Sequence, residues 1–165
     1  ASYNATQDVI NTVNIYDPTV QQWSACTNFG GNYFDPDLEV GPGSVLFFNS
    51  YQALDFYSIG AMPATNAQYN IVSGYNTIML PLNKSSLNYV SLLAMDMGPN
   101  DEINTVNLWD PSVQQWNACT NFGDNYFDPD PEISIATPLF LNSYANFVWP
   151  SGPRSTNSVP VRSTK

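Results

Sequence analysis

Two stretches of the chain mix hydrophobic and polar residues in the manner of a β-hairpin. INTVNIYDPTVQQW begins at Ile10, and INTVNLWDPSVQQW begins at Ile103. Each stretch is rich in strand-forming residues and is interrupted by Asp-Pro followed by Thr or Ser, with aromatic residues on either side. Each stretch therefore predicts two antiparallel strands joined by a turn.

Further strands are predicted after each hairpin. Val45–Asn49 and Leu139–Asn142 are short hydrophobic runs bounded by turn residues, and they are followed by LDFYSI and NFVW. Between the two halves, Tyr75–Leu82 predicts a strong strand.

The only helix predicted from the sequence spans about Ser85–Met97. Leu87, Val90, Leu93 and Met97 recur there at helical spacing. Ser85 or Ser86 is the expected N-terminal cap, because a serine hydroxyl can accept a hydrogen bond from the first free backbone N–H groups.

The two halves are copies of one sequence. Ile10–Tyr51 and Ile103–Tyr144 are identical at 29 of 42 positions without a gap, which predicts one backbone trace for both. We therefore predict a mainly β fold with two tandem homologous modules, each a small sandwich or barrel. The expected modules are 1–66 and 67–165, the second of which holds the strand at 75–82, the helix at about 85–97 and a C-terminal tail at 154–165.

A strand–helix segment precedes only the second copy. The first copy is preceded by nine residues, ASYNATQDV, and the corresponding segment does not follow the second copy. A β module without one strand has an open edge, which natural proteins seldom leave exposed. Tyr75–Leu82 can complete only one copy, so a strand from a neighbouring chain is expected to complete the other.

Composition and charge limit the expected partners and location of the protein. Fourteen acidic and four basic residues give a formal charge of −10, which disfavours nucleic acids and anionic membranes as partners. No apolar run is long enough to be inserted in a membrane. The few charges, many polar residues and N-terminal alanine are typical of a mature secreted protein, outside the cell or on its surface, in which Asn4 and Asn83 fit the N-glycosylation pattern.

Residues for catalysis are scarce. The chain has no histidine, which excludes Ser-His-Asp and Cys-His catalysis and histidine-bound zinc, and it has no phosphate-binding loop. Carboxylates at alternate positions suggest either a glycosidase pair, a calcium site or plain turns, and we favour turns, with no enzyme, metal or cofactor. These carboxylates are Asp35, Asp37, Glu39, Asp128, Asp130 and Glu132.

Cysteines and aromatic residues also repeat between the copies. Cys26 and Cys119 occupy equivalent positions, and we expect them to be small buried residues rather than a disulfide. The repeated aromatic residues are expected to pack in the β core, with a sugar-binding platform as the alternative. They are Tyr16, Trp23, Phe29, Tyr33, Trp109, Trp116, Phe122 and Tyr126.

The order of these motifs resembles a known type of module. GYNTIMLPL, a short helix and TVNLWDPSVQQWNA, together with LEVGPGSVLFFNS, are similar to a β-rich module repeated in secreted bacterial surface and fibre proteins. The second copy departs from it, with EISIATPLFLN where the first has Gly41-Pro42-Gly43. The resemblance implies a structural role at the cell surface and no particular chemistry.

The functional hypothesis is a self-assembling subunit of an extracellular filament. The tail TNSVPVRSTK alternates Val159 and Val161 with polar residues and carries Arg162 and Lys165, so it can donate a strand to the acidic body of another subunit. Repeated head-to-tail contacts of this kind give a homopolymer. The alternatives are a piece of a longer repeat array, and a secreted carbohydrate-binding or adhesin module with glycans as partners.

Overall fold

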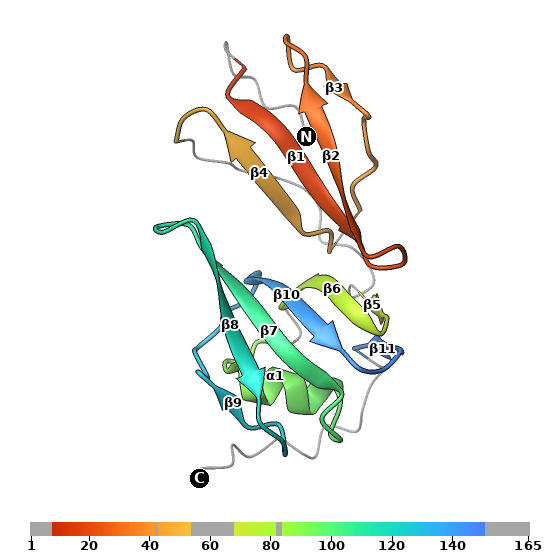
Figure 1. Ribbon diagram of the computed structural model, residues 1–165, viewed down its shortest axis with the longest axis vertical. Helices are drawn as coiled ribbons and strands as arrows, with labels where there is room; N and C mark the ends of the chain where they lie inside the picture. Colours follow the sequence, from red (N-terminus) through yellow and green to blue (C-terminus); the bar gives the residue numbers. More distant parts are fainter. Residues whose placement is uncertain (1–7, 42, 54–67, 82–83, 151–165) are drawn as a thin grey trace.

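The computed structural model describes residues 8–41, 43–53, 68–81 and 84–150. Within these residues the chain is mainly β, as predicted, with antiparallel sheets and one short helix (Figure 1). The strands of the first copy are β1 (Ile10–Asp17), β2 (Gln22–Asn28), β3 (Phe34–Asp35) and β4 (Leu46–Ser50). The other elements are β5 (Tyr69–Ile71), β6 (Gly74–Met79), α1 (Val90–Met97), β7 (Ile103–Asp110), β8 (Gln115–Asn121), β9 (Phe127–Asp128), β10 (Pro138–Ser143) and β11 (Phe147–Trp149).

Both copies build the same sheet. The first sheet has the strand order β3-β2-β1-β4, and the second has β9-β8-β7-β10 with β6 added next to β10. The register is also the same, because Val13 lies opposite Cys26 in the first sheet and Val106 lies opposite Cys119 in the second. The prediction of one trace for both copies is confirmed for these strands.

The hairpin turns are held by the Asp-Pro motif. The backbone N–H and hydroxyl of Thr19 donate to Asp17 Oδ1 at 2.8 and 2.6 Å, and Ser112 repeats both bonds to Asp110 in the second copy. The hydrogen bond from the Thr19 hydroxyl is the largest cause that lowers the pKa of Asp17. A short acceptor side chain that bonds its own backbone two residues on is the physical reason for Asp at these turns.

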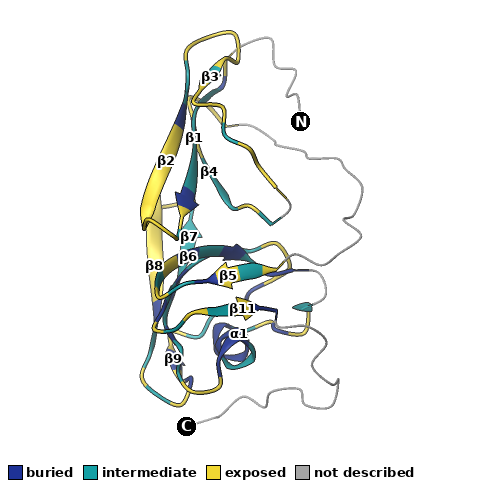
Figure 2. Ribbon diagram, turned by 90° about the vertical axis from the view of Figure 1, so that its right-hand side faces the viewer, coloured by how far each residue is buried: buried dark blue, intermediate teal, exposed yellow. Residues whose placement is uncertain are grey.

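The core of the structure lies between the second sheet and α1. Ile78 on β6, Leu93 on α1, Val106 on β7 and Leu141 on β10 are all fully buried. Figure 2 shows the dark, buried helix beside this sheet. Such burial contributes about 1.5–3 kcal/mol for each side chain, so β6 and α1 account for much of the stability of this module.

A two-stranded ribbon of β5 and β11 closes the core. Trp149 on β11 is buried, and its indole N–H donates to Asp96 Oδ2 on α1 at 2.8 Å. Lys84 forms an ion pair with the same carboxylate at 2.8 Å. The ribbon is thereby connected to the helix.

The helix begins later than predicted. It starts at Val90, residues 85–86 form a turn, and neither serine there acts as its cap. The cap comes from Asp130 in the following copy, whose two carboxylate oxygens accept the backbone N–H and the hydroxyl of Ser91 at 3.0 and 2.8 Å. A cap from 39 residues away cannot be found by local sequence pattern.

The predicted strand at 75–82 is observed as Gly74–Met79. It ends before Pro81, which has no backbone N–H to continue a ladder. Val45–Asn49, Leu139–Asn142 and NFVW are confirmed as β4, β10 and β11 within one or two residues. The strand predicted in LDFYSI and the C-terminal tail lie outside the described residues, and the expected module boundaries stay a prediction.

Candidate functional site

The inner face of each sheet, defined as the face that α1 covers in the second module, has the same hydrophobic positions in both copies but different burial. Leu141 is fully buried whereas its counterpart Phe48 is 36% exposed, and Ile133 is 5% exposed whereas Val40 is 53% exposed. The same contrast holds for Ile103 and Ile10, Val106 and Val13, Phe127 and Phe34, and Leu139 and Leu46. We call this surface of the first sheet the open face.

Two elements make the difference. In the second module β6 pairs with β10, with Ile78 opposite Leu139 and Asn76 opposite Leu141, and α1 packs over the same face. In the part of the chain that the structure describes, β4 pairs only with β1, and no second helix covers the first sheet. The first sheet therefore presents an apolar face and an unpaired strand edge.

The strand predicted to complete one of the copies completes the second. This assignment follows from the tight connections around β6, since only a short turn separates it from β5 of the same module. The side chain of Asn76 fixes that turn by accepting the N–H of Val72 at 2.9 Å and donating to its carbonyl at 2.8 Å.

The six acidic candidates for calcium take different roles. Asp130 caps α1, and Glu132 accepts the hydroxyl of Tyr89 at 2.8 Å. Their counterparts Asp37 and Glu39 are exposed and accept no side-chain hydrogen bond from the described residues. Asp35 and Asp128 end the short strands β3 and β9. Among the described residues no group of three acids, cysteines or histidines could hold a metal ion.

Four of the eight repeated aromatic residues, Tyr16, Trp23, Trp109 and Trp116, join the two modules. Tyr16 meets Phe140 edge to face at 5.0 Å between ring centroids, and Phe47 meets Trp109 in the same way at 4.7 Å. Trp23 and Trp116 both lie within 6 Å of Phe140. These rings therefore pack against one another between the outer faces of the sheets, rather than in two separate cores as the sequence suggests.

The remaining aromatic residues stand on loops. Phe29 and Phe122 are each 69% exposed, and Tyr33 and Tyr126 lie beside them, joined through backbone hydrogen bonds of 2.8 Å. Each loop thus presents a phenylalanine to solvent at an equivalent position.

Gln21 connects the first hairpin to β6. Its amide N–H₂ donates to the carbonyl of Tyr75 at 2.9 Å, and its oxygen accepts the N–H of Tyr75 at 2.6 Å. The equivalent Gln114 has the same turn conformation and the same bond to a proline carbonyl. Within the described residues its side-chain amide makes no other hydrogen bond.

A carboxylate organises the loop after β2 and β8 in each copy. Asp101 accepts the backbone N–H groups of Asp124 and Asn125, and Asp8 accepts those of Gly31 and Asn32 at 2.8 and 2.7 Å. The bond from Asn125 is the largest cause that lowers the pKa of Asp101, and the bond from Asn32 is the largest for Asp8.

The lowered pKa values predict a dependence of stability on pH. A group with a folded pKa below its unfolded value of about 3.9 stabilises the fold above that pH, and this contribution is lost as the pH falls through the folded pKa. Urea unfolding of the wild type and of the double variant Asp8→Asn, Asp101→Asn should differ in midpoint at pH 7. The difference should shrink below about pH 4. A difference that stays constant down to pH 2.5 would contradict this role.

Cys26 and Cys119 are free and buried, as expected for small core residues. Burial raises the pKa of the Cys119 thiol to about 11, so this thiol is poorly reactive at neutral pH.

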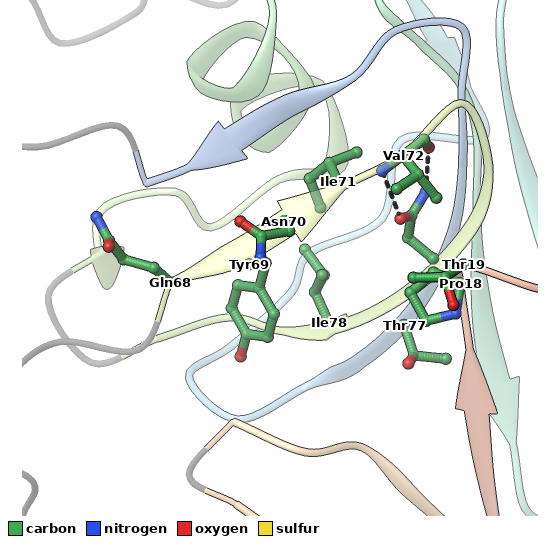
Figure 3. A pocket seen from close by; sticks show the side chains of 10 residues that line it. Pro18, Thr19, Gln68, Tyr69, Asn70, Ile71, Val72, Thr77 and Ile78 are labelled. Carbon is green, nitrogen blue, oxygen red and sulfur yellow. Dashed lines mark hydrogen bonds between the residues drawn. The ribbon is translucent and has the colours of Figure 1, made fainter.

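A cavity of about 290 Å³ lies where the first hairpin meets β5 and β6 (Figure 3). Pro18 and Thr19 come from the hairpin, and Tyr69, Ile71 and Ile78 come from the strands. Its lining has no carboxylate, amine or thiol.

Several predicted site residues lie outside the described residues and stay predictions. They are the assembly residues Val159, Val161, Arg162 and Lys165, and the glycosylation candidates Asn4 and Asn83. The groups that sequence reasoning missed are Gln21 and the helix-capping role of Asp130. The acidic residues at alternate positions drew attention to Asp130, but only the structure shows that it binds Ser91 of α1.

The described part of the chain has no helix with the length and hydrophobicity that spanning a bilayer requires. Among the described surfaces the open face is the strongest candidate for a functional site, because it combines exposed hydrophobic side chains with an unpaired strand edge. No protein-family model, curated protein or solved structure matches this chain.

Proposed function

We propose that this protein is a structural subunit of an extracellular filament, in which subunits join because the open face of one accepts a strand from the next. The observation that carries the proposal is the contrast between two nearly identical sheets. One is completed by β6 and α1, whereas the described residues leave the other with a free edge and exposed hydrophobic side chains.

The physics of strand addition supports this role. A strand that adds to β4 gains backbone hydrogen bonds and covers hydrophobic side chains, each worth about 1.5–3 kcal/mol when fully buried. Several such side chains exceed the cost of association, which is estimated at 4–15 kcal/mol or more, only if the fit is close. A repeated contact between different surfaces of identical subunits produces an open filament rather than a closed dimer.

The test uses two matched valines. Val40 lies on the open face and is 53% exposed, whereas Val113 lies in the β7–β8 turn and is 56% exposed. We expect Val40→Asp to raise the concentration needed for assembly at least tenfold, because a charge on the face costs more than the roughly 1.4 kcal/mol that corresponds to that factor. Val113→Asp should leave assembly unchanged.

Sedimentation velocity and negative-stain microscopy over a range of protein concentrations measure the effect. A wild-type chain that stays monomeric at every concentration, or equal assembly of the two variants, would overturn the proposal.

Carbohydrate binding is the second candidate, and the exposed Phe29 and Phe122 favour it. Aromatic rings that stand free on loops can stack on the apolar faces of sugars. A glycan array with the wild type and with Phe29→Ala, Phe122→Ala distinguishes the two functions, because loss of glycan binding with normal assembly would assign these rings to sugar recognition.

A further inference from the structure

The geometry points to a particular occupant of the open face: a strand–helix element with the chemistry of residues 68–97, carried by another polypeptide. Its strand adds to β4 and its helix lies across the first sheet. The inference rests on the proposed function, because it names what completes the first module. It is drawn from the second module, in which the same sheet already holds such an element.

The strand has a defined position. In the second module Ile78 lies opposite Leu139 and Asn76 lies opposite Leu141. The residues of β4 that correspond to Leu139 and Leu141 are Leu46 and Phe48, and the pairing of β4 with β1 repeats that of β10 with β7. An incoming strand of the same type therefore meets equivalent backbone positions and a similar apolar surface, in which Phe48 takes the place of Leu141.

The first module has acidic residues at the positions that bind the helix in the second module. In the second module Asp130 caps α1 through Ser91, and Glu132 holds the hydroxyl of Tyr89. Asp37 and Glu39 are the same residue types at the equivalent positions, exposed and without such a helix among the described residues. A helix docked on the first sheet gives both carboxylates the partners that their counterparts have.

A third residue that can bind the incoming element, Gln114, belongs to the second copy. Gln21 of the first hairpin holds both backbone groups of Tyr75 on β6, and Tyr75 stacks on Phe140 with ring centroids 4.9 Å apart. The second hairpin packs against β4 as the first hairpin packs against β10, since Trp109 and Trp116 contact Phe47, the counterpart of Phe140. Gln114 is therefore placed to hold the tyrosine of a strand added to β4.

Asp37 and Glu39 distinguish a strand–helix element from a single strand, because only such an element brings a helix to them. The C-terminal tail can offer Val159 and Val161 to the edge of β4, but a tail strand brings no helix N-terminus to Asp37. A strand–helix element should therefore bind more tightly than the tail and displace it.

The experiment adds a synthetic polypeptide of residues 67–100 to the full chain and measures binding by calorimetry. We expect one-to-one binding that slows hydrogen exchange of the β4 amides, with the β10 amides as the internal reference. Asp37→Ala should weaken binding about tenfold, as expected for loss of a charge-assisted cap, whereas the neighbouring Asp35→Ala should not. Gln114→Ala should weaken it, whereas Gln21→Ala should not.

A covalent version keeps the inference testable if the polypeptide aggregates. Replacing residues 1–7 by a second copy of 67–100 places Asn100 before Asp8, as it precedes Asp101 in the natural chain. Hydrogen exchange of the β4 amides should then slow markedly, and Asp37→Ala in this chain should restore faster exchange. Unchanged exchange, or binding that neither Asp37→Ala nor Gln114→Ala weakens, would overturn the inference.

The outcome is separable from that of the proposed function. Binding of the polypeptide to a chain that never assembles alone would refute the filament and support the inference. A chain that assembles normally and does not bind the polypeptide would refute the inference and support the filament.

Discussion

Replacing Leu139 by alanine is expected to lower the free energy of unfolding by about 3–5 kcal/mol, whereas Leu46→Ala should lower it by less than about 1.5 kcal/mol. The two leucines occupy the same register position in the two sheets, but Leu139 is 1% exposed beneath β6 and α1 and Leu46 is only half-buried. Removing Leu139 leaves a cavity between packed side chains, whereas solvent and neighbouring groups can fill the space left by Leu46.

Urea unfolding followed by tryptophan fluorescence measures both variants. The aromatic contacts between the modules place tryptophans from both copies in one cluster, so the signal reports on each. Equal losses for Leu46→Ala and Leu139→Ala would show that the open face is as fully packed as its counterpart.

Deleting Asn157–Lys165 is expected to abolish polymerisation and to leave the second module folded. The filament hypothesis assigns the donor strand to this tail, where burial of Val159 and Val161 contributes about 1.5–3 kcal/mol each and basic residues meet an acidic body. Pro160 cannot donate to a ladder, so its position in the strand must face solvent.

The matched control replaces Val159 and Val161 by aspartate without shortening the chain, and it should have the same effect. Electron microscopy gives the presence, diameter and pitch of fibres, and circular dichroism checks the fold. Fibres of normal diameter from the truncated chain would exclude the C-terminal tail. Loss of fibres on trimming Ala1–Gln7 instead would transfer the donor role to the N-terminus.

Local patterns in the sequence predicted the hairpins well. Asp-Pro-Thr and Asp-Pro-Ser form turns because their bonds connect residues two positions apart, and such bonds need nothing from the rest of the chain. The helix was predicted less well. Its start at Val90 depends on Asp130, a residue of another element, whose position is known only when the sheet has formed.

The candidate site was predicted in outline. A strand and a helix that precede only the second copy indicated that the second module holds them and that the first module is incomplete. The aromatic residues were assigned to separate cores, whereas Tyr16, Trp23 and Phe47 pack against residues of the other module. Nothing in the spacing of a single strand indicates whether its outer face meets solvent or a second sheet.

The sequence by itself determined the β class, the hairpins and the equivalence of the two copies, because these depend on residue type, turn chemistry and identity at matched positions. Only the tertiary structure decided that β6 pairs with β10 and α1 packs over the inner face of the second sheet, that Asp130 caps a helix, and that Asp37, Glu39 and Gln114 lack such partners among the described residues. The physical reason is that burial and hydrogen bonding between distant segments depend on which surfaces meet, and two copies with nearly the same sequence can differ in that respect alone.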